Sequence, residues 1–247
     1  MNNIPTIAII IIIFVGIASP WLLKRWKSEA GPGHPVNATT NEEMLMPDQP
    51  ISFGYKCMWF AIKSTDPAKL IATLNLTRVK PCNWQTGTDR IYGDYIFITP
   101  PIDRWTLACG YGLPHGDTPE GIQYVKELLK TLSYDYNEAQ FFCTHRVTEY
   151  HCWIRAVDGN VTRVYSFLGE AGENVLIEGE PTPFEKMLNL VDTSSEEAKD
   201  ERYLERKDLT LPTEDTLMKV AENWSVNPST LEVRNDIEPG LGLLAEW

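Results

Sequence analysis

The chain has 247 residues, of which 43% are hydrophobic and 23% charged, and its formal net charge at pH 7 is -12. This charge excludes a nucleic-acid partner, because phosphate binding requires clustered Lys and Arg, and it disfavours a domain that lies flat on anionic lipid. The length allows one large core, or a core with a small appendage.

The first predicted element is a transmembrane helix at residues 4–23. The segment "IPTIAIIIIIFVGIASPWLL" contains 20 residues and no charge, enough at helical rise to cross a hydrocarbon core of roughly 30 Å. The alternative is a cleaved secretory signal, but the preceding "MNN" has no Lys or Arg, and the apolar run is longer than a signal requires. We therefore expect a retained anchor, with the lipid bilayer as its partner.

Three cations follow this span directly: Lys24, Arg25 and Lys27. The positive-inside bias predicts a single-pass membrane protein with its C-terminal domain on the cytoplasmic side, and the extracytoplasmic side is the alternative. All five cysteines follow the span, and an odd number fits a reducing compartment. Sequons for N-glycosylation, which would matter only in a lumen, begin at Asn37, Asn75, Asn160 and Asn223.

The composition divides the rest of the chain into three parts. Residues 24–52 form a juxtamembrane tether that we expect to be largely disordered, because residues 28–52 contain four prolines and no aromatic residue. Residues 53–191 form the core domain. Residues 192–247 begin with a densely charged connector and continue into short C-terminal helices.

The predicted helices start with the same sequence pattern, an N-cap residue followed by proline. It occurs at residues 66–67, 118–119, 182–183 and 227–228. The second of these begins the clearest helix, whose apolar stripe is Ile122, Val125, Leu128, Leu129 and Leu132. At the third, Thr182 and Glu185 have the spacing of a capping box.

Strands are predicted between these helices, at residues 57–62, 95–99, 105–111 and 161–167. The order of helices and strands predicts an α+β fold in which helices pack on a mainly antiparallel sheet, and a ferredoxin-like arrangement is one option.

The stretch "CTHRVTEYHC", residues 143–152, concentrates two cysteines and two histidines. Because residues 139–157 contain no Gly, Pro, Asn or Asp, nothing marks a turn, and one long strand is the plain interpretation. His145 and His151 would then lie about 20 Å apart. One zinc ion could not bind both, since its nitrogen ligands lie about 2 Å away.

A tight turn at residues 147–148 is the alternative. It places Cys143 opposite Cys152 and sends His145 and His151 to opposite faces of the sheet. The ligands do not converge in either arrangement, so we predict no metal site. We expect buried cysteines and histidines that face the surface.

Two further sequence patterns, a glycine-rich stretch and a Cys–His pair, indicate structural roles more than binding or catalytic ones. The glycine-rich "GYGLPHGDTPEG", residues 110–121, lacks the G-K-[ST] ending of a phosphate loop, so we interpret it as a loop that leads into a helix. A thiol nucleophile made of Cys143 and His145 would need side chains in contact, whereas such positions on a strand stand about 7 Å apart. Carboxylates that recur beside glycines and indicate solvated turns are Glu170, Glu173 and Glu180.

Residues 217–232, "LMKVAENWSVNPSTLE", resemble the helix-turn-helix pattern, with Ala221 at its small-residue position. Trp224 departs from that pattern, because a small turn residue is expected there. Residues 211–247 contain seven acidic and two basic side chains, a net charge of 2 − 7 = −5, which repels DNA. We therefore predict two short packed helices.

The leading functional hypothesis is a membrane-tethered, non-catalytic domain that binds a basic protein partner. The candidate binding residues are His145, Glu149, His151, Trp153 and Trp84, with Trp105 as a further aromatic anchor. The alternative is a hydrolase-like or thiol enzyme that uses His145, Glu149 or His151. No cofactor, metal or small-molecule ligand is implied.

Overall fold

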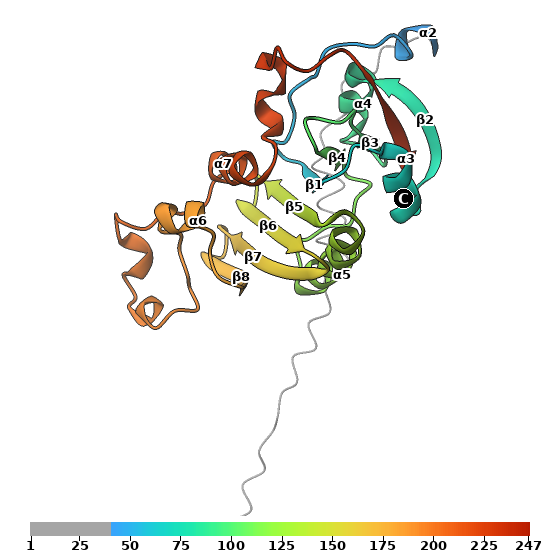
Figure 1. The fold of residues 1–247 in the computed structure, drawn as a ribbon. Helices are drawn as coiled ribbons and strands as arrows, with labels where there is room; N and C mark the ends of the chain where they lie inside the picture. The colour runs from blue at the N-terminus through green and yellow to red at the C-terminus, as the bar shows by residue number, and fades with distance from the viewer. Residues whose placement is uncertain (1–40) are drawn as a thin grey trace, which may run out of the picture. The chain divides into compact units, whose positions relative to one another are not determined.

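A computed structural model describes residues 41–247 (Figure 1). The predicted transmembrane helix at 4–23 and the tether up to residue 40 lie outside the described residues. Within residues 41–247, every helix is too short or too polar to cross a membrane.

Nine strands form one sheet in the order β2-β9-β3-β4-β1-β5-β6-β7-β8, and every neighbouring pair is antiparallel. This confirms the α+β class with an antiparallel sheet, and the sheet is larger than the compact ferredoxin-like unit. The strands are β1 Met58–Ile62, β2 Thr77–Asn83, β3 Ile96–Ile98, β4 Thr106–Cys109, β5 Glu138–His145, β6 Tyr150–Val157, β7 Asn160–Leu168, β8 Glu173–Glu178 and β9 Leu241–Glu246. The helices are α2 Asn41–Met44, α3 Pro67–Thr73, α4 Trp84–Arg90, α5 Pro119–Tyr136, α6 Pro183–Leu188 and α7 Glu214–Trp224, with 3-10 turns at η1 Glu197–Lys199, η2 Tyr203–Glu205 and η3 Pro228–Val233.

The predicted helix starts are confirmed in detail. Side-chain oxygens of Asp66, Thr118 and Thr182 accept backbone hydrogen bonds at the first turns of α3, α5 and α6. The capping box of α6 is present. Asn227 caps η3, a 3-10 turn rather than an α-helix. These starts were predictable because each cap depends on residues that are adjacent in the sequence.

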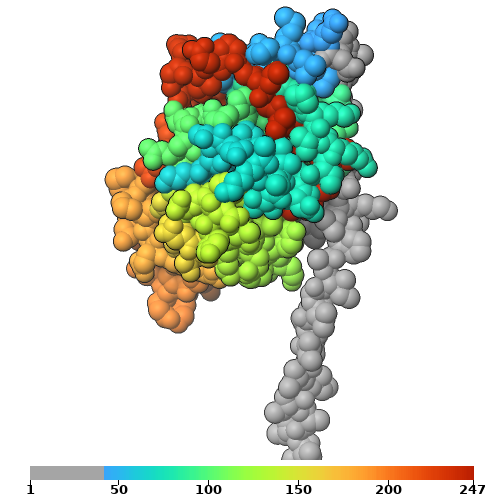
Figure 2. All heavy atoms as spheres, turned by 45° about the vertical axis from the view of Figure 1, so that its right-hand side comes forward, coloured from blue at the N-terminus to red at the C-terminus, as the bar shows by residue number. Residues whose placement is uncertain are grey.

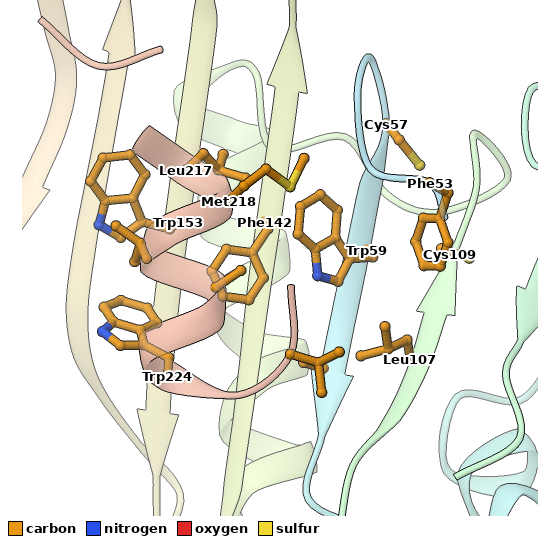
Figure 3. Close-up of a cluster of buried hydrophobic side chains, with 14 of the residues drawn as sticks. Phe53, Cys57, Trp59, Leu107, Cys109, Phe142, Trp153, Leu217, Met218 and Trp224 are labelled. Carbon is orange, nitrogen blue, oxygen red and sulfur yellow. The ribbon is translucent and has the colours of Figure 1, made fainter. Parts of the chain in front are cut away.

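The centre of the sheet is covered on both faces, as β5 shows. Phe141 and Phe142 are neighbours on β5, so their side chains point to opposite faces. Phe141 packs under Gly116 in the loop before α5, whereas the Phe142 ring contacts Trp224 of α7 at 5.9 Å between centroids. Helix α7 runs along β5, from Glu214 beside Thr144 to Trp224 beside Gln140. It directs Leu217, Met218 and Trp224 toward the aromatic core (Figure 3).

Helix α6 is fastened to the sheet by a buried carboxylate. Glu185 Oε1 accepts hydrogen bonds from Trp153 Nε1 at 2.9 Å and from Arg163 Nε at 2.8 Å. Glu185 Oε2 accepts from the backbone N–H and the hydroxyl of Thr182, each at 2.9 Å. Because every bond reaches a buried charge, this network stabilises the position of α6.

The two ends of the described chain meet on the fold. Asp48 accepts from the backbone N–H groups of Trp84 and Gln85 at the start of α4 and forms a bridge with Gly240. Figure 2 shows the early blue residues beside the red C-terminal residues. Residues 48–52, which the sequence assigned to the tether, therefore contact the fold, and β9 completes the sheet between β2 and β3.

Residues 139–157 form a hairpin, so the plain interpretation of one long strand is wrong. The turn occupies residues 146–149, and Glu149 has a left-handed φ of 49°. Cys143 pairs with Cys152, the register of the alternative interpretation. The turn contains no Gly, Pro, Asn or Asp. A side-chain hydrogen bond holds it instead: the Thr148 hydroxyl lies 3.1 Å from Nδ1 of His145.

Candidate functional site

The candidate site lies at the end of the sheet where four segments meet. These are the turn at 146–149, the loop at 110–118, residues 54–57, and the N-terminus of α7. Both stretches that the sequence singled out, 143–152 and 110–121, converge here.

The glycines of the 110–121 loop are required by close packing. A Cβ at Gly116 would lie 2.7 Å from the Phe141 ring, and a Cβ at Gly121 would lie 2.2 Å from the His115 carbonyl oxygen. The Tyr150 hydroxyl donates to the Gly116 carbonyl and lies 2.8 Å from Ser166 Oγ. The glycines thus let the loop fold tightly over β5 and β6.

His145 is buried, with 7% of its surface exposed. It opposes Tyr150 in the hairpin and lies on the sheet face that the 110–118 loop covers. Burial raises the pKa of the Asp117 carboxyl, and the nearby His145 partly offsets this rise. The prediction that His145 faces the surface is therefore wrong, because the loop covers that face.

His151 is also buried, with 3% exposed, on the opposite face. Its Nδ1 lies 3.0 Å from the Thr144 hydroxyl, which in turn lies 3.5 Å from Glu214 Oε1. Burial lowers the pKa of His151 to about 4, and Glu214 opposes this shift. His151 is therefore neutral at pH 7, and the prediction of a surface-facing ring is wrong here too, because α7 covers this face.

The thiols are buried, as predicted. All five cysteines are free, and Cys143 and Cys152 are fully buried. Burial raises the pKa of Cys143 well above its ordinary value and that of Cys152 to about 12. Because the thiolate is the nucleophilic form, these groups are poorly suited to covalent catalysis.

The side chains also do not gather as metal ligands do. Within residues 41–247, no three His, Cys, Asp or Glu side chains are grouped closely enough to hold a metal ion. The two histidines of the hairpin lie on opposite faces, as the alternative register requires. A tetrahedral zinc site needs ligands that converge on one point.

The remaining predicted residues are separated. Trp84 and Trp153 are fully buried, and Trp105 is 6% exposed, so none can anchor a partner at the surface. The Trp153 indole N–H donates a hydrogen bond to the Glu185 carboxylate. Glu149 is exposed at the hairpin turn, where its carbonyl accepts from Gly169.

A surface that sequence reasoning missed lies at the same end of the sheet. It consists of Tyr55, Tyr92 and Tyr111, and we call it the tyrosine surface. Tyr55 is 39% exposed and Tyr92 is 47% exposed. The rings of Tyr92 and Tyr111 meet edge to face, with centroids 5.8 Å apart and planes at 79°. Three separate segments supply these residues, so only the fold unites them.

The three phenols are held in place by their hydroxyl groups. Tyr92 donates to the carbonyl of Tyr55 at 3.3 Å, Tyr111 donates to the carbonyl of Lys56 at 2.8 Å, and Tyr55 donates to Asp215 Oδ1 at 3.2 Å. Burial raises the pKa of Tyr92, and it raises the pKa of Tyr111 to about 12. The hydroxyls therefore stay protonated donors at neutral pH, and the rings are ordered before any partner binds.

Glu214 joins this surface to the hairpin and to α7. Its Oε2 accepts from Arg146 Nε at 2.7 Å, and its Oε1 accepts from the backbone N–H of Lys56 at 3.0 Å. The Arg146 guanidinium lies 5.9 Å from the centroid of the Tyr55 ring, within cation–π range. The site is thus an aromatic surface on a network of ion pairs and hydrogen bonds.

Comparison with known proteins finds no match to this chain. No protein-family model matches it, and neither curated proteins nor solved structures give a significant match.

Proposed function

We propose that this chain is a membrane-tethered, non-catalytic domain that binds a basic protein partner through the tyrosine surface. The observation that carries this proposal is the cluster of the exposed Tyr55 and Tyr92 with the half-buried Tyr111. Their hydroxyls are held by the carbonyls of Tyr55 and Lys56 and by the Asp215 carboxylate. Tyrosine is enriched at protein interfaces, where it supplies a large contact area together with a polar group.

Rigid side chains favour binding for an energetic reason. Ordering a flexible side chain at an interface costs about 0.5 to 1.5 kcal/mol. The hydrogen bonds of Tyr92 and Tyr111 and their mutual ring contact restrict these rings before binding. The tyrosine surface therefore loses less entropy than flexible side chains of equal area would lose.

Charge supports the choice of a basic partner. The chain carries a net charge of -12. The exposed Asp215 accepts from the Tyr55 hydroxyl, and the exposed Asp94 follows Tyr92 by two residues. Lys56 and Arg146 also lie there, but Arg146 is neutralised by Glu214. Long-range attraction would then speed the encounter with a positively charged protein.

Catalysis is less well supported by the same geometry. Nδ1 of His145 and Nδ1 of His151 bond threonine hydroxyls on opposite faces. The thiol of Cys143 has a raised pKa and no exposed surface. A nucleophile with an oriented base requires side chains that converge.

Site-specific photocrosslinking tests the proposal. The full-length chain is expressed in its native membrane with p-benzoylphenylalanine in place of Tyr92, and a second preparation carries it in place of Tyr134. Tyr134 is the matched control, because it is 80% exposed on α5, away from the tyrosine surface.

We expect a discrete crosslinked protein of basic composition from position 92 and none from position 134. Equal crosslinking at both positions, or none at position 92, would contradict the proposal.

A further inference from the structure

One edge of the sheet is open to an additional strand. Strand β8 is the outermost strand beyond β7 (Figure 1). None of its six residues is buried, in contrast to the buried centre of β7. In the described part of the chain, two side chains bond its backbone: the Thr193 hydroxyl accepts from the Asn174 N–H at 2.8 Å, and Arg163 Nη1 of β7 donates to the Glu178 carbonyl at 3.5 Å. Within residues 41–247, no other side-chain or loop bond reaches the backbone of residues 175–177, so their outward groups are free to pair.

The opposite edge is protected. Strand β2 carries Arg78, Lys80 and Pro81, and its pairing with β9 shifts register between Thr77 and Lys80. Cations, proline and bulges are the features that keep an edge strand from pairing with another chain. Strand β8 has no Lys, Arg or Pro, and its one irregularity is an extra residue, Val175, beside the pairs of Ser166 and Phe167.

All charged residues in the chain segment that contains β8 are acidic. Residues 169–180 contain Glu170, Glu173, Glu178 and Glu180 and no basic residue. Lys126 pairs with Glu178 at 2.5 Å, which leaves Glu173 and Glu180 exposed at the two ends of the strand. These carboxylates flank the apolar centre Val175–Ile177.

We propose that β8 binds an extended, basic segment of a partner protein as a tenth strand. Main-chain hydrogen bonds to residues 175–177 would supply the pairing, and Glu173 and Glu180 would select for Lys or Arg. This inference rests on the proposed function for the basic character of the partner, but it concerns a different surface.

The charge pattern also selects among the possible occupants. Antiparallel pairing of β8 with a second copy would bring Glu173 of one strand toward Glu178 of the other, and facing like charges are destabilising. The chain's own juxtamembrane cations, Lys24, Arg25 and Lys27, follow the predicted span directly, and that span would hold them at the membrane surface. A basic segment of another protein meets neither obstacle.

A peptide-binding experiment tests this inference on the full-length chain in neutral detergent. The probe is a fluorescent eight-residue peptide of alternating Lys and Val. One control peptide has the same sequence with alternate backbone amides methylated, which keeps the charge and removes donors. Glu173→Lys combined with Glu180→Lys is the protein variant, and Glu42→Lys combined with Glu232→Lys is its control, since those two carboxylates are also exposed.

We expect at least tenfold weaker binding for the methylated peptide and for the β8 variant, and little change for the control variant. Hydrogen exchange should show new protection in residues 173–178 and none in residues 77–83. Equal binding of the methylated peptide, or no binding at all, would overturn the inference. Protection at the tyrosine surface instead would overturn it while leaving the proposed function intact. Equally tight binding of a peptide with residues 22–29 of this chain would overturn the choice of occupant.

Discussion

Replacing His151 should remove a defined part of the pH dependence of stability. Its pKa is lowered from 6.5 to about 4, first because burial disfavours the imidazolium, while Glu214 opposes the shift. Between these values the unfolded chain binds a proton at this residue and the native chain does not. The free energy of unfolding therefore falls as the pH falls through this window.

The magnitude follows from the two pKa values. Linkage gives a loss of about 2 kcal/mol between pH 7 and pH 5, and about 3 kcal/mol between pH 7 and pH 4. His151→Gln keeps a polar group beside Thr144 but does not titrate. Its free energy of unfolding should therefore change about 2 kcal/mol less than that of the wild type between pH 7 and pH 5.

Urea denaturation of the full-length chain, followed by tryptophan fluorescence, measures both slopes. An NMR titration of the His151 ring gives the pKa itself. Full pH dependence in His151→Gln, or a ring that titrates near pH 6.5, would show that burial of His151 does not lower its pKa.

Three other predictions concern stability and topology. Glu185→Ala leaves Arg163 buried without its carboxylate partner, so it should lower the free energy of unfolding in denaturant by about 3 to 5 kcal/mol. The control Glu196→Ala removes an exposed ion pair and should leave the unfolding midpoint unchanged. Equal effects of the two variants would show that the buried network does not stabilise the fold. Cys143→Ala should cost about 1 kcal/mol through a small cavity, and a chelator should leave thermal unfolding unchanged; unfolding by chelator would indicate a structural metal. Three sequons have exposed asparagines, Asn75, Asn160 and Asn223, so a domain in the lumen could be glycosylated. When the chain is translated with microsomes, we expect no glycan, because the positive-inside bias places the domain on the cytoplasmic side. An attached glycan would show the opposite orientation.

The features that could be predicted from the sequence are those set by neighbouring residues. The caps at Asp66, Thr118 and Thr182 and the stripe of α5 depend on local spacing, and the structure contains them. The plain interpretation of the sequence, one long strand, missed the hairpin at 146–149. Side chains such as Thr148 and Arg146 hold its turn. Turn residues that the sequence could flag are absent there.

Features that depend on distant parts of the chain could not be predicted. Strand β9 enters the sheet between β2 and β3 from the C-terminus, and its sequence gives no sign of this pairing. The histidines were expected at the surface, but the 110–118 loop and α7 cover the two faces. Tyr55, Tyr92 and Tyr111 carry no local motif, so the tyrosine surface emerges only when three segments meet.

Binding of a protein partner by the tyrosine surface, as proposed above, can be measured directly. The most direct measurement compares the affinity of the partner captured at position 92 for two variants of the full-length chain. One variant combines Tyr55→Ala with Tyr92→Ala, and the other combines Tyr124→Ala with Tyr134→Ala on the exposed face of α5. We expect at least a tenfold rise in Kd for the first variant and an unchanged Kd for the second. Equal affinity of the first variant and the wild type, with both folded, would contradict the proposal.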